Sequence, residues 1–149
     1  MSDQPPQRRK PPGCLSALAV AVALILIMKV YGYVQVAYQR AIWESRAPDS
    51  YVLMGRYVAI IPPAGKHILR MKNGRATLED GWECNADCPF LPAHMFDAIQ
   101  GCGIWFPLTI CSVEYDPTYG FPSDYSTDCW LPGAECLEAV KVLYFAPLK

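Results

Sequence analysis

The sequence predicts an α+β fold: one N-terminal transmembrane helix, then a small antiparallel sheet with one or two helices packed on one face, stapled by disulfides. Three observations predict it. Residues 15–28 form an uninterrupted apolar run in which only Ser16 is polar. Six of the seven cysteines follow that run. Beyond it, short aromatic and β-branched segments bounded by turn residues accompany two helical patterns, which is typical of helices covering one face of a sheet.

The N-terminal sequence predicts a cytoplasmic tail and an uncleaved signal-anchor. Residues 1–13 contain four prolines and few apolar side chains, so this basic tail is expected to be disordered. Arg8, Arg9 and Lys10 favour a cytoplasmic position for the tail. The run 15–28 is shorter than the roughly 20 residues needed to span a bilayer, which is typical of a cleaved signal peptide. The apolar sequence resumes after Lys29, however, and no small-x-small cleavage site follows Met28. Residues 14–38 are therefore predicted to be a transmembrane signal-anchor.

The predicted anchor separates one cysteine from the other six. Cys14 precedes the apolar run and is predicted to be a free thiol, whereas the other six are predicted to pair in an oxidising compartment. Sequence-local pairing is expected: Cys84–Cys88, Cys102–Cys111 and Cys129–Cys136. The alternative is that Cys84 and Cys88 pair with partners farther along the chain. The Cys-x-x-x-Cys spacing of the first pair differs from that of structural zinc sites, and His67 and His94 are the only imidazoles. The sequence therefore predicts no metal and no cofactor.

Residues 39–149 are predicted to be the exported α+β domain. The anchor helix continues into this domain with an apolar stripe at Val34, Tyr38 and Ile42. It ends at Ala47-Pro48, because the residue before a proline is disfavoured in a helix. A second helix is predicted over residues 92–100, ended by the glycines at 101 and 103. The expected order is helix, three strands, helix, and two or three strands.

The predicted strands are bounded by turn signals. Residues 51–61 and 66–72 are expected strands, and Asn73-Gly74 is the strongest short hairpin signal. The chain then returns as a strand within 75–82. Later strands are expected at 110–115, 124–128 and 138–146. Between the first two of these, Gly120 is expected to supply a positive φ to a turn, and Pro122 to stop strand pairing.

The sequence Tyr-Asp-Pro-Thr-Tyr-Gly-Phe-Pro at 115–122 has two interpretations. Its turn chemistry favours a structural role. Two tyrosines and a carboxylate at the end of a hairpin also make Tyr115, Asp116 and Tyr119 candidate partner contacts. Trp105, in the apolar stretch 104–108, is the fourth candidate contact if that stretch is exposed. A calcium site at the aspartates of this region is disfavoured, because they lack the spacing of an EF-hand loop.

The same segment carries a resemblance to a known family. In order along the chain stand Trp43, Ser50-Tyr51, Asn73-Gly74, Phe96-Asp97, the segment 115–122 and Asp128. Over residues 42–128 the chain thereby resembles a family of bacterial exported and lipoprotein domains of unknown function. That family's pattern runs Trp, Ser-Tyr, Gly, Phe-Asp, Tyr-Asp-Pro-x-Tyr-Gly-Tyr-Pro and Asp. Phe121 stands where the family favours Tyr, and the six cysteines and the segment after Asp128 are departures. The resemblance implies an exported location and this fold class, and it implies no reaction.

The net charge of the predicted domain and its lack of catalytic motifs disfavour two classes of function, nucleic-acid binding and catalysis. Residues 38–149 carry nine Lys and Arg against thirteen Asp and Glu, a net charge of −4, so nucleic acid is not an expected partner. No nucleophile elbow, zinc-protease motif or phosphate-binding glycine loop is present, and no catalytic residue is predicted. The expected function is a non-enzymatic accessory subunit of a membrane or envelope complex. It would contact membrane lipid through residues 14–38 and bind other membrane or envelope proteins through its domain.

Two alternatives to this function stay open. One is an envelope thiol-redox protein that uses Cys84 or Cys88. The other is a small-ligand-binding module with a pocket between sheet and helix, which a concave cavity with convergent polar groups would favour.

Overall fold

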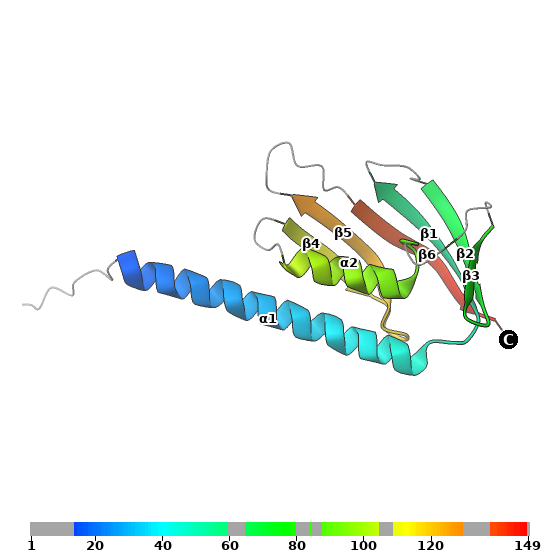
Figure 1. The fold of residues 1–149 in the computed structure, drawn as a ribbon, viewed down its shortest axis with the longest axis horizontal. Helices are drawn as coiled ribbons and strands as arrows, with labels where there is room; N and C mark the ends of the chain where they lie inside the picture. The colour runs from blue at the N-terminus through cyan, green and yellow to red at the C-terminus, as the bar shows by residue number, and fades with distance from the viewer. Residues whose placement is uncertain are drawn as a thin grey trace, which may run out of the picture.

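The computed structural model describes residues 14–59, 65–79, 84, 88–104, 109–129 and 138–148. Two helices and six strands make up this part of the chain (Figure 1). Their order confirms the predicted succession of helix, three strands, helix and three strands. The elements are α1 (Cys14–Arg46), β1 (Tyr51–Ala59), β2 (Gly65–Lys72), β3 (Arg75–Leu78), α2 (Pro92–Ile104), β4 (Thr109–Tyr115), β5 (Pro122–Cys129) and β6 (Glu138–Pro147).

The strands form one antiparallel sheet in the order β3-β2-β1-β6-β5-β4. Strands β1 to β3 form one meander and strands β4 to β6 form another. The two meanders join where β6 pairs with β1, from Tyr51 opposite Pro147 to Ala59 opposite Glu138. The C-terminal strand therefore lies in the middle of the sheet and makes one continuous core out of two local units.

The β2–β3 hairpin confirms its sequence signal. Asn73 and Gly74 have φ values of 52° and 74°, the positive values that a two-residue primed turn requires. On the β2 side Leu69 pairs with Leu78 of β3, and both side chains are buried. The return strand ends at Leu78, so it is shorter than the predicted span, whose last residues lie outside the described part.

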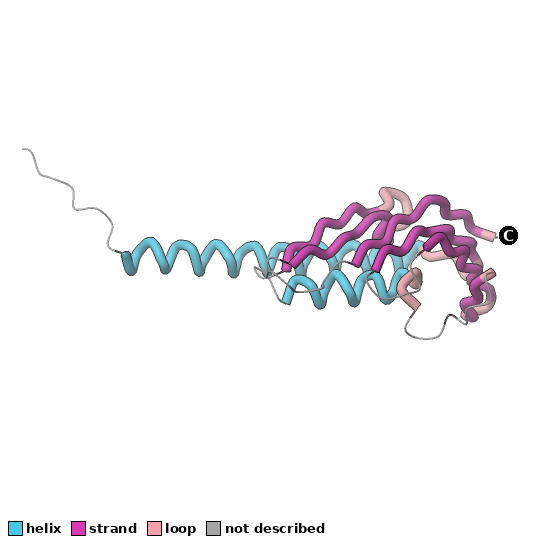
Figure 2. Tube along the Cα trace, turned by 90° about the horizontal axis from the view of Figure 1, so that it is seen from above, coloured by secondary structure: helices cyan, strands magenta, loops and turns pink. Residues whose placement is uncertain are grey.

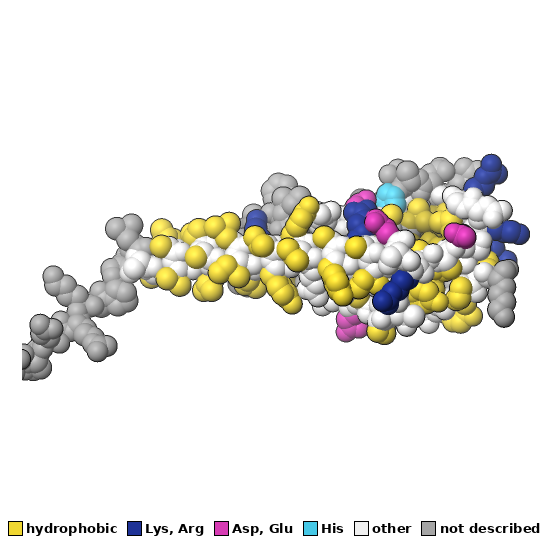
Figure 3. All heavy atoms as spheres, turned by 90° about the horizontal axis from the view of Figure 1, so that it is seen from below, with side chains coloured by type: hydrophobic (Ala, Val, Ile, Leu, Met, Phe, Trp, Pro, Cys, Tyr) yellow, Lys and Arg dark blue, Asp and Glu magenta, His cyan; other side chains and the backbone are white. Residues whose placement is uncertain are grey.

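Both helices lie on the same side of the sheet, and the N-terminal half of α1 extends well beyond it (Figures 1 and 2). Apolar side chains cover this extended half (Figure 3). Within Ser16–Arg46 the most apolar stretch has a mean hydropathy of 2.2, and none of it is buried. This helix is long and apolar enough to cross a membrane, which indicates a single-pass membrane protein. The predicted tail, residues 1–13, lies outside the described residues.

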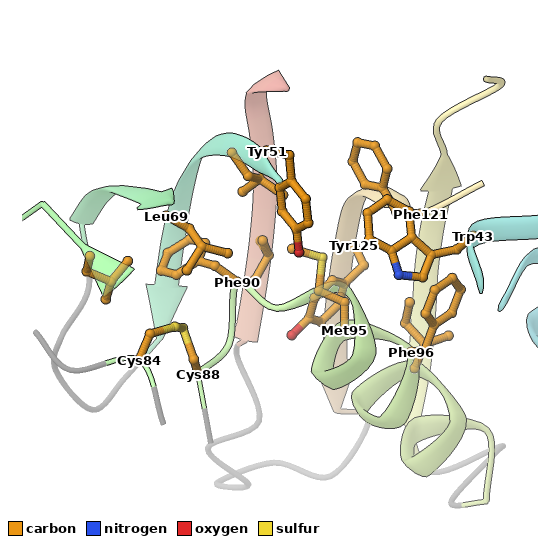
Figure 4. Close-up of a cluster of buried hydrophobic side chains, with 14 of the residues drawn as sticks. Trp43, Tyr51, Leu69, Cys84, Cys88, Phe90, Met95, Phe96, Phe121 and Tyr125 are labelled. Carbon is orange, nitrogen blue, oxygen red and sulfur yellow. A yellow bond between two sulfur atoms is a disulfide. The ribbon is translucent and has the colours of Figure 1, made fainter. Parts of the chain in front are cut away.

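The core fills the space between the sheet and the two helices (Figure 4). Leu53 and Leu69 from the sheet and Phe96 from α2 are fully buried. Trp43 enters from α1, and its ring meets Tyr51 at 5.6 Å and Phe121 at 5.5 Å between centroids, both edge to face. Edge-to-face contacts of this kind add to the burial energy of each ring. The aromatic cluster therefore fixes the C-terminal half of α1 on the domain.

The predicted apolar stripe of α1 is wrong at two of its three positions. Val34 and Tyr38 are 58% and 64% exposed, whereas Ile42 is half-buried and lies close to Gly120. The buried positions are instead Val36 and Trp43, seven residues and about two helical turns apart. Arg40 lies on this packed side, with its guanidinium 5.8 Å from the ring centroid of Phe96. Trp43 fixes the packed side, because its ring is 9% exposed and makes edge-to-face contacts with Tyr51 and Phe121.

Two predicted boundaries also need correction. Helix α2 runs through Gly101 and Gly103 to Ile104, because a glycine costs only about 1 kcal/mol in a helix and Cys102 is fixed by a disulfide. Pro122 does not stop pairing but is the first residue of β5, opposite Tyr115. A proline is tolerated at the first position of a strand, where its missing N–H disrupts no ladder.

Candidate functional site

An apolar groove lies between α1 and the domain. It has a volume of about 600 Å³. Residues from 28–36 of α1 form one wall, and the other walls come from α2 through Ile99 and Cys102 and from β4 through Val113 and Tyr115. Volumes of this size are typical of sites for small organic ligands. The α1 wall is far from the other walls in sequence, since its last lining residue, Val36, precedes Ile99 of α2 by 63 residues.

The groove exists because α1 is held to the domain only along its C-terminal part. Val36 is 6% exposed, whereas Tyr31 and Tyr33 on the preceding turns are 69% and 61% exposed. The Arg40 guanidinium donates to Asp97 of α2 over 2.9 Å, which holds the two helices together just beyond the groove. Towards its N-terminus α1 leaves the domain (Figure 1). The groove is lined by the part of α1 near this point, from Met28 to Val36.

A disulfide joins two walls of the groove. Cys102 of α2 is bonded to Cys111 of β4, with their Cα atoms 6.3 Å apart, and both residues line the groove. Such a bond limits how far α2 and β4 can separate. The structure also pairs Cys84 with Cys88, so two of the three sequence-local pairs are confirmed. The third predicted pair, which involves Cys136, lies outside the described residues.

Tyr115 is the one predicted contact residue that the structure places in the groove. Its ring stacks on Phe96 with 6.3 Å between centroids and 20° between planes. Its hydroxyl oxygen is buried and has no hydrogen-bond partner among the described residues. Burial raises the pKa of Tyr115 to about 12, so the group is a neutral phenol at physiological pH. A buried hydroxyl without an acceptor is costly, and protein encloses this oxygen, so a molecule in the groove does not reach it.

Two of the other predicted contacts, Asp116 and Tyr119, lie in the turn before β5. The Asp116 carboxylate accepts the backbone N–H groups of Thr118 and Tyr119 at 2.9 and 2.7 Å, so it closes its own turn. The Tyr119 ring is half-buried against Phe145, 4.9 Å away between centroids. These positions favour the structural role of the turn, and contact with a partner stays a prediction for both residues. Trp105 lies outside the described residues.

Sequence reasoning missed the exposed face of the sheet, opposite the helices. Strand alternation places Ile68, Met54 and Tyr144 side by side across β2, β1 and β6. Tyr144 is 53% exposed, and Leu143 at the adjoining β-bulge is 49% exposed. No described helix covers this face (Figure 1). The signal in the sequence was the apolar pair Leu143-Tyr144. A strand with one face in water is expected to alternate apolar and polar residues, and this pair departs from that alternation.

Charged residues follow the next row of this face. One row crosses five strands and reads, from β2 to β4, Lys66, Arg56, Lys141, Asp124 and Glu114. Its basic residues come first and its acidic residues last. Lys141 and Asp124 form an ion pair at the junction, with Nζ and Oδ2 2.7 Å apart, and this pairing raises the pKa of Lys141. The exposed face thus combines an apolar row with a row of opposed charge.

A tyrosine–carboxylate cluster lies at the other side of the sheet. The Tyr125 hydroxyl donates to Glu138 Oε1 over 2.7 Å. Burial, and then the bond to Glu138 and its charge, raise the pKa of Tyr125. Burial and the Glu138 charge also raise the pKa of Tyr57. No group of three or more metal-ligating side chains occurs within the described ranges. His67 lies in β2 and His94 in α2, so the fold does not unite them on one element.

Comparisons with known proteins give no match: no family model, curated protein or solved structure is similar to this chain. The resemblance to exported bacterial domains of unknown function therefore stays a prediction. The residues that carried it have structural roles here. Trp43 and Tyr51 are core, and Asn73-Gly74 is a hairpin turn.

Proposed function

We propose that this chain is a non-enzymatic, single-pass membrane protein whose exported domain binds another membrane or envelope protein as an accessory subunit. The N-terminus is cytoplasmic, and α1 carries the domain at the far membrane surface. The basic cluster Arg8, Arg9 and Lys10 before the apolar run supports this orientation. The two disulfides support an oxidising compartment for the domain.

The observation that carries the binding role is the exposed face of the sheet. Isolated apolar residues on a surface need no explanation, but Tyr144, Leu143 and Met54 are contiguous on this face. Tyrosine and methionine are enriched in interfaces. The adjoining row of three cations and two anions would fix the orientation of a partner and discourage others. The partner expected here is a protein surface with an apolar centre and an opposite charge gradient.

A photo-crosslinking experiment in the native membrane tests this role. A benzophenone amino acid replaces Tyr144 in the full chain, and the matched control carries it at Ala93, an exposed position of α2. Discrete adducts are expected from position 144 and not from position 93. The substitution Arg56→Glu inverts part of the charged row and should weaken the adduct, whereas Arg75→Glu at the hairpin end should not. Identical adducts from both positions, or none from Tyr144, would contradict the proposal.

The size of the groove supports the second function, a ligand-binding module. Its volume of about 600 Å³ has the size that such a module needs, but its lining is predominantly apolar, so the expected convergent polar groups do not support it. The two functions use opposite sides of the domain and do not exclude each other. The thiol-redox alternative is less supported, because Cys84 and Cys88 are 9% and 4% exposed and a reactive thiol pair requires access.

A further inference from the structure

We propose that the groove between α1 and the domain binds one acyl chain of a bilayer phospholipid. This inference rests on the membrane anchoring in the proposed function. It goes beyond that function because it names an intramolecular lipid site. Three features of the described residues carry it: the position of the groove along α1, its chemistry, and its size.

The position of the groove coincides with the exit of α1 from the membrane. A bilayer core of about 30 Å takes roughly 20 helical residues. A span that begins at the start of the apolar run therefore ends near residue 34. The α1 wall of the groove runs from Met28 to Val36, so it straddles this exit. Lipid chains and ester groups of the adjacent leaflet are the molecules present at that depth.

The chemistry of the groove fits a lipid chain. Its lining is predominantly apolar, and an apolar cavity favours an apolar occupant over water.

The size of the groove favours a single chain over a helix of another protein. A helix with its side chains is 10–12 Å wide, so two turns occupy roughly 850–1,200 Å³. The groove measures about 600 Å³. The Cys102–Cys111 disulfide joins two of its walls and opposes widening. An acyl chain, which is narrower than a helix, can enter without separating α2 from β4.

A photoactivatable lipid tests the proposal. The full-length protein is reconstituted in vesicles of phosphatidylcholine that includes a phosphatidylcholine with a diazirine on one acyl chain. After irradiation, labelled peptides are mapped. Labelling of the span in α1 is expected from membrane insertion alone. The groove predicts additional labelling of α2 and β4, at peptides that contain Ile99 and Val113.

Two substitutions at neighbouring positions separate the groove from the bilayer. Gly32 lines the groove, and a Cβ added there meets no atom within 4 Å, so Gly32→Trp fills the groove without disturbing the core. Tyr31→Trp places the same side chain on an exposed side of α1 as the matched control. Label on α2 and β4 should fall at least fivefold in Gly32→Trp and persist in Tyr31→Trp.

The outcomes distinguish the two proposals. If α1 is unlabelled and alkaline carbonate extracts the protein from membranes, the anchor and the proposed function fail. If α1 is labelled but α2 and β4 are not, or if Gly32→Trp leaves their label intact, the groove is not a lipid site and the inference is overturned. Label on α2 and β4 that Gly32→Trp removes and Tyr31→Trp retains supports it.

Discussion

Gly120 is the residue at which the packing of α1 against the domain can be tested most directly. Its φ of 79° lies in the left-handed region, as the turn interpretation of residues 116–122 requires. A Cβ added at this position would lie 2.8 Å from Ile42 Cγ2 and 3.0 Å from the backbone oxygen of Gln39. The turn therefore contacts α1 so closely that only a hydrogen atom fits between them.

Gly120→Ala should lower the free energy of unfolding by about 2–5 kcal/mol. A non-glycine residue in the left-handed region costs about 1–2 kcal/mol. Overpacking a well-packed contact costs about 1–3 kcal/mol more, because the side chain of Ile42 can move but the Gln39 carbonyl belongs to the helix backbone. The larger side chain of valine in Gly120→Val should increase this loss.

Gly74→Ala is the matched control for this measurement. Gly74 has a similar φ of 74°, but a Cβ added there meets no atom within 4 Å. Its loss should be only the backbone part, about 1–2 kcal/mol. Unfolding of the full-length variants by urea in detergent, followed by near-ultraviolet circular dichroism, reports the aromatic core that contains Trp43. If Gly120→Ala loses no more stability than Gly74→Ala, α1 does not pack on the turn as described.

Three further predictions follow from the described contacts. Non-reducing peptide mapping should recover Cys102 joined to Cys111, and a free thiol at either residue would contradict the pairing. Burial raises the pKa of Tyr51 to about 12 from 10.0, so its contribution to stability should be complete below pH 10 and be lost as the pH rises towards 12. Urea midpoints measured across that range check this, and a flat profile would argue against a buried phenol. Asp97→Asn should cost 1 kcal/mol or less, because the ion pair with Arg40 is largely exposed, and a larger loss of the urea midpoint would show that the pair is desolvated.

Local signals predicted most of the elements in this fold. Asn73-Gly74 predicted its hairpin because a primed turn needs two residues that tolerate positive φ. Gly101 gave the wrong end for α2, because the disulfide from Cys102 to Cys111 of β4 holds the helix beyond its glycines. The insertion of β6 between β1 and β5 could not be predicted either. It depends on pairing between strands almost 90 residues apart, and alternation within each strand is the same for any neighbour.

The groove illustrates why a binding site can be absent from sequence patterns even when its residues are ordinary. The α1 wall of the groove was predicted to be part of the membrane span. A bilayer surrounds a span with the same apolar environment on every side, so the sequence does not show which side faces the domain. Val36 differs from Val34 only through contacts that the domain supplies, and the position of Trp43 seven residues later determines which side packs. Tyr115 was singled out for its place in a turn, yet β4 places its ring against Phe96 of α2 and in the wall of the groove. The site is thus a consequence of where a continuous helix changes from one apolar environment, the bilayer, to another, the domain core.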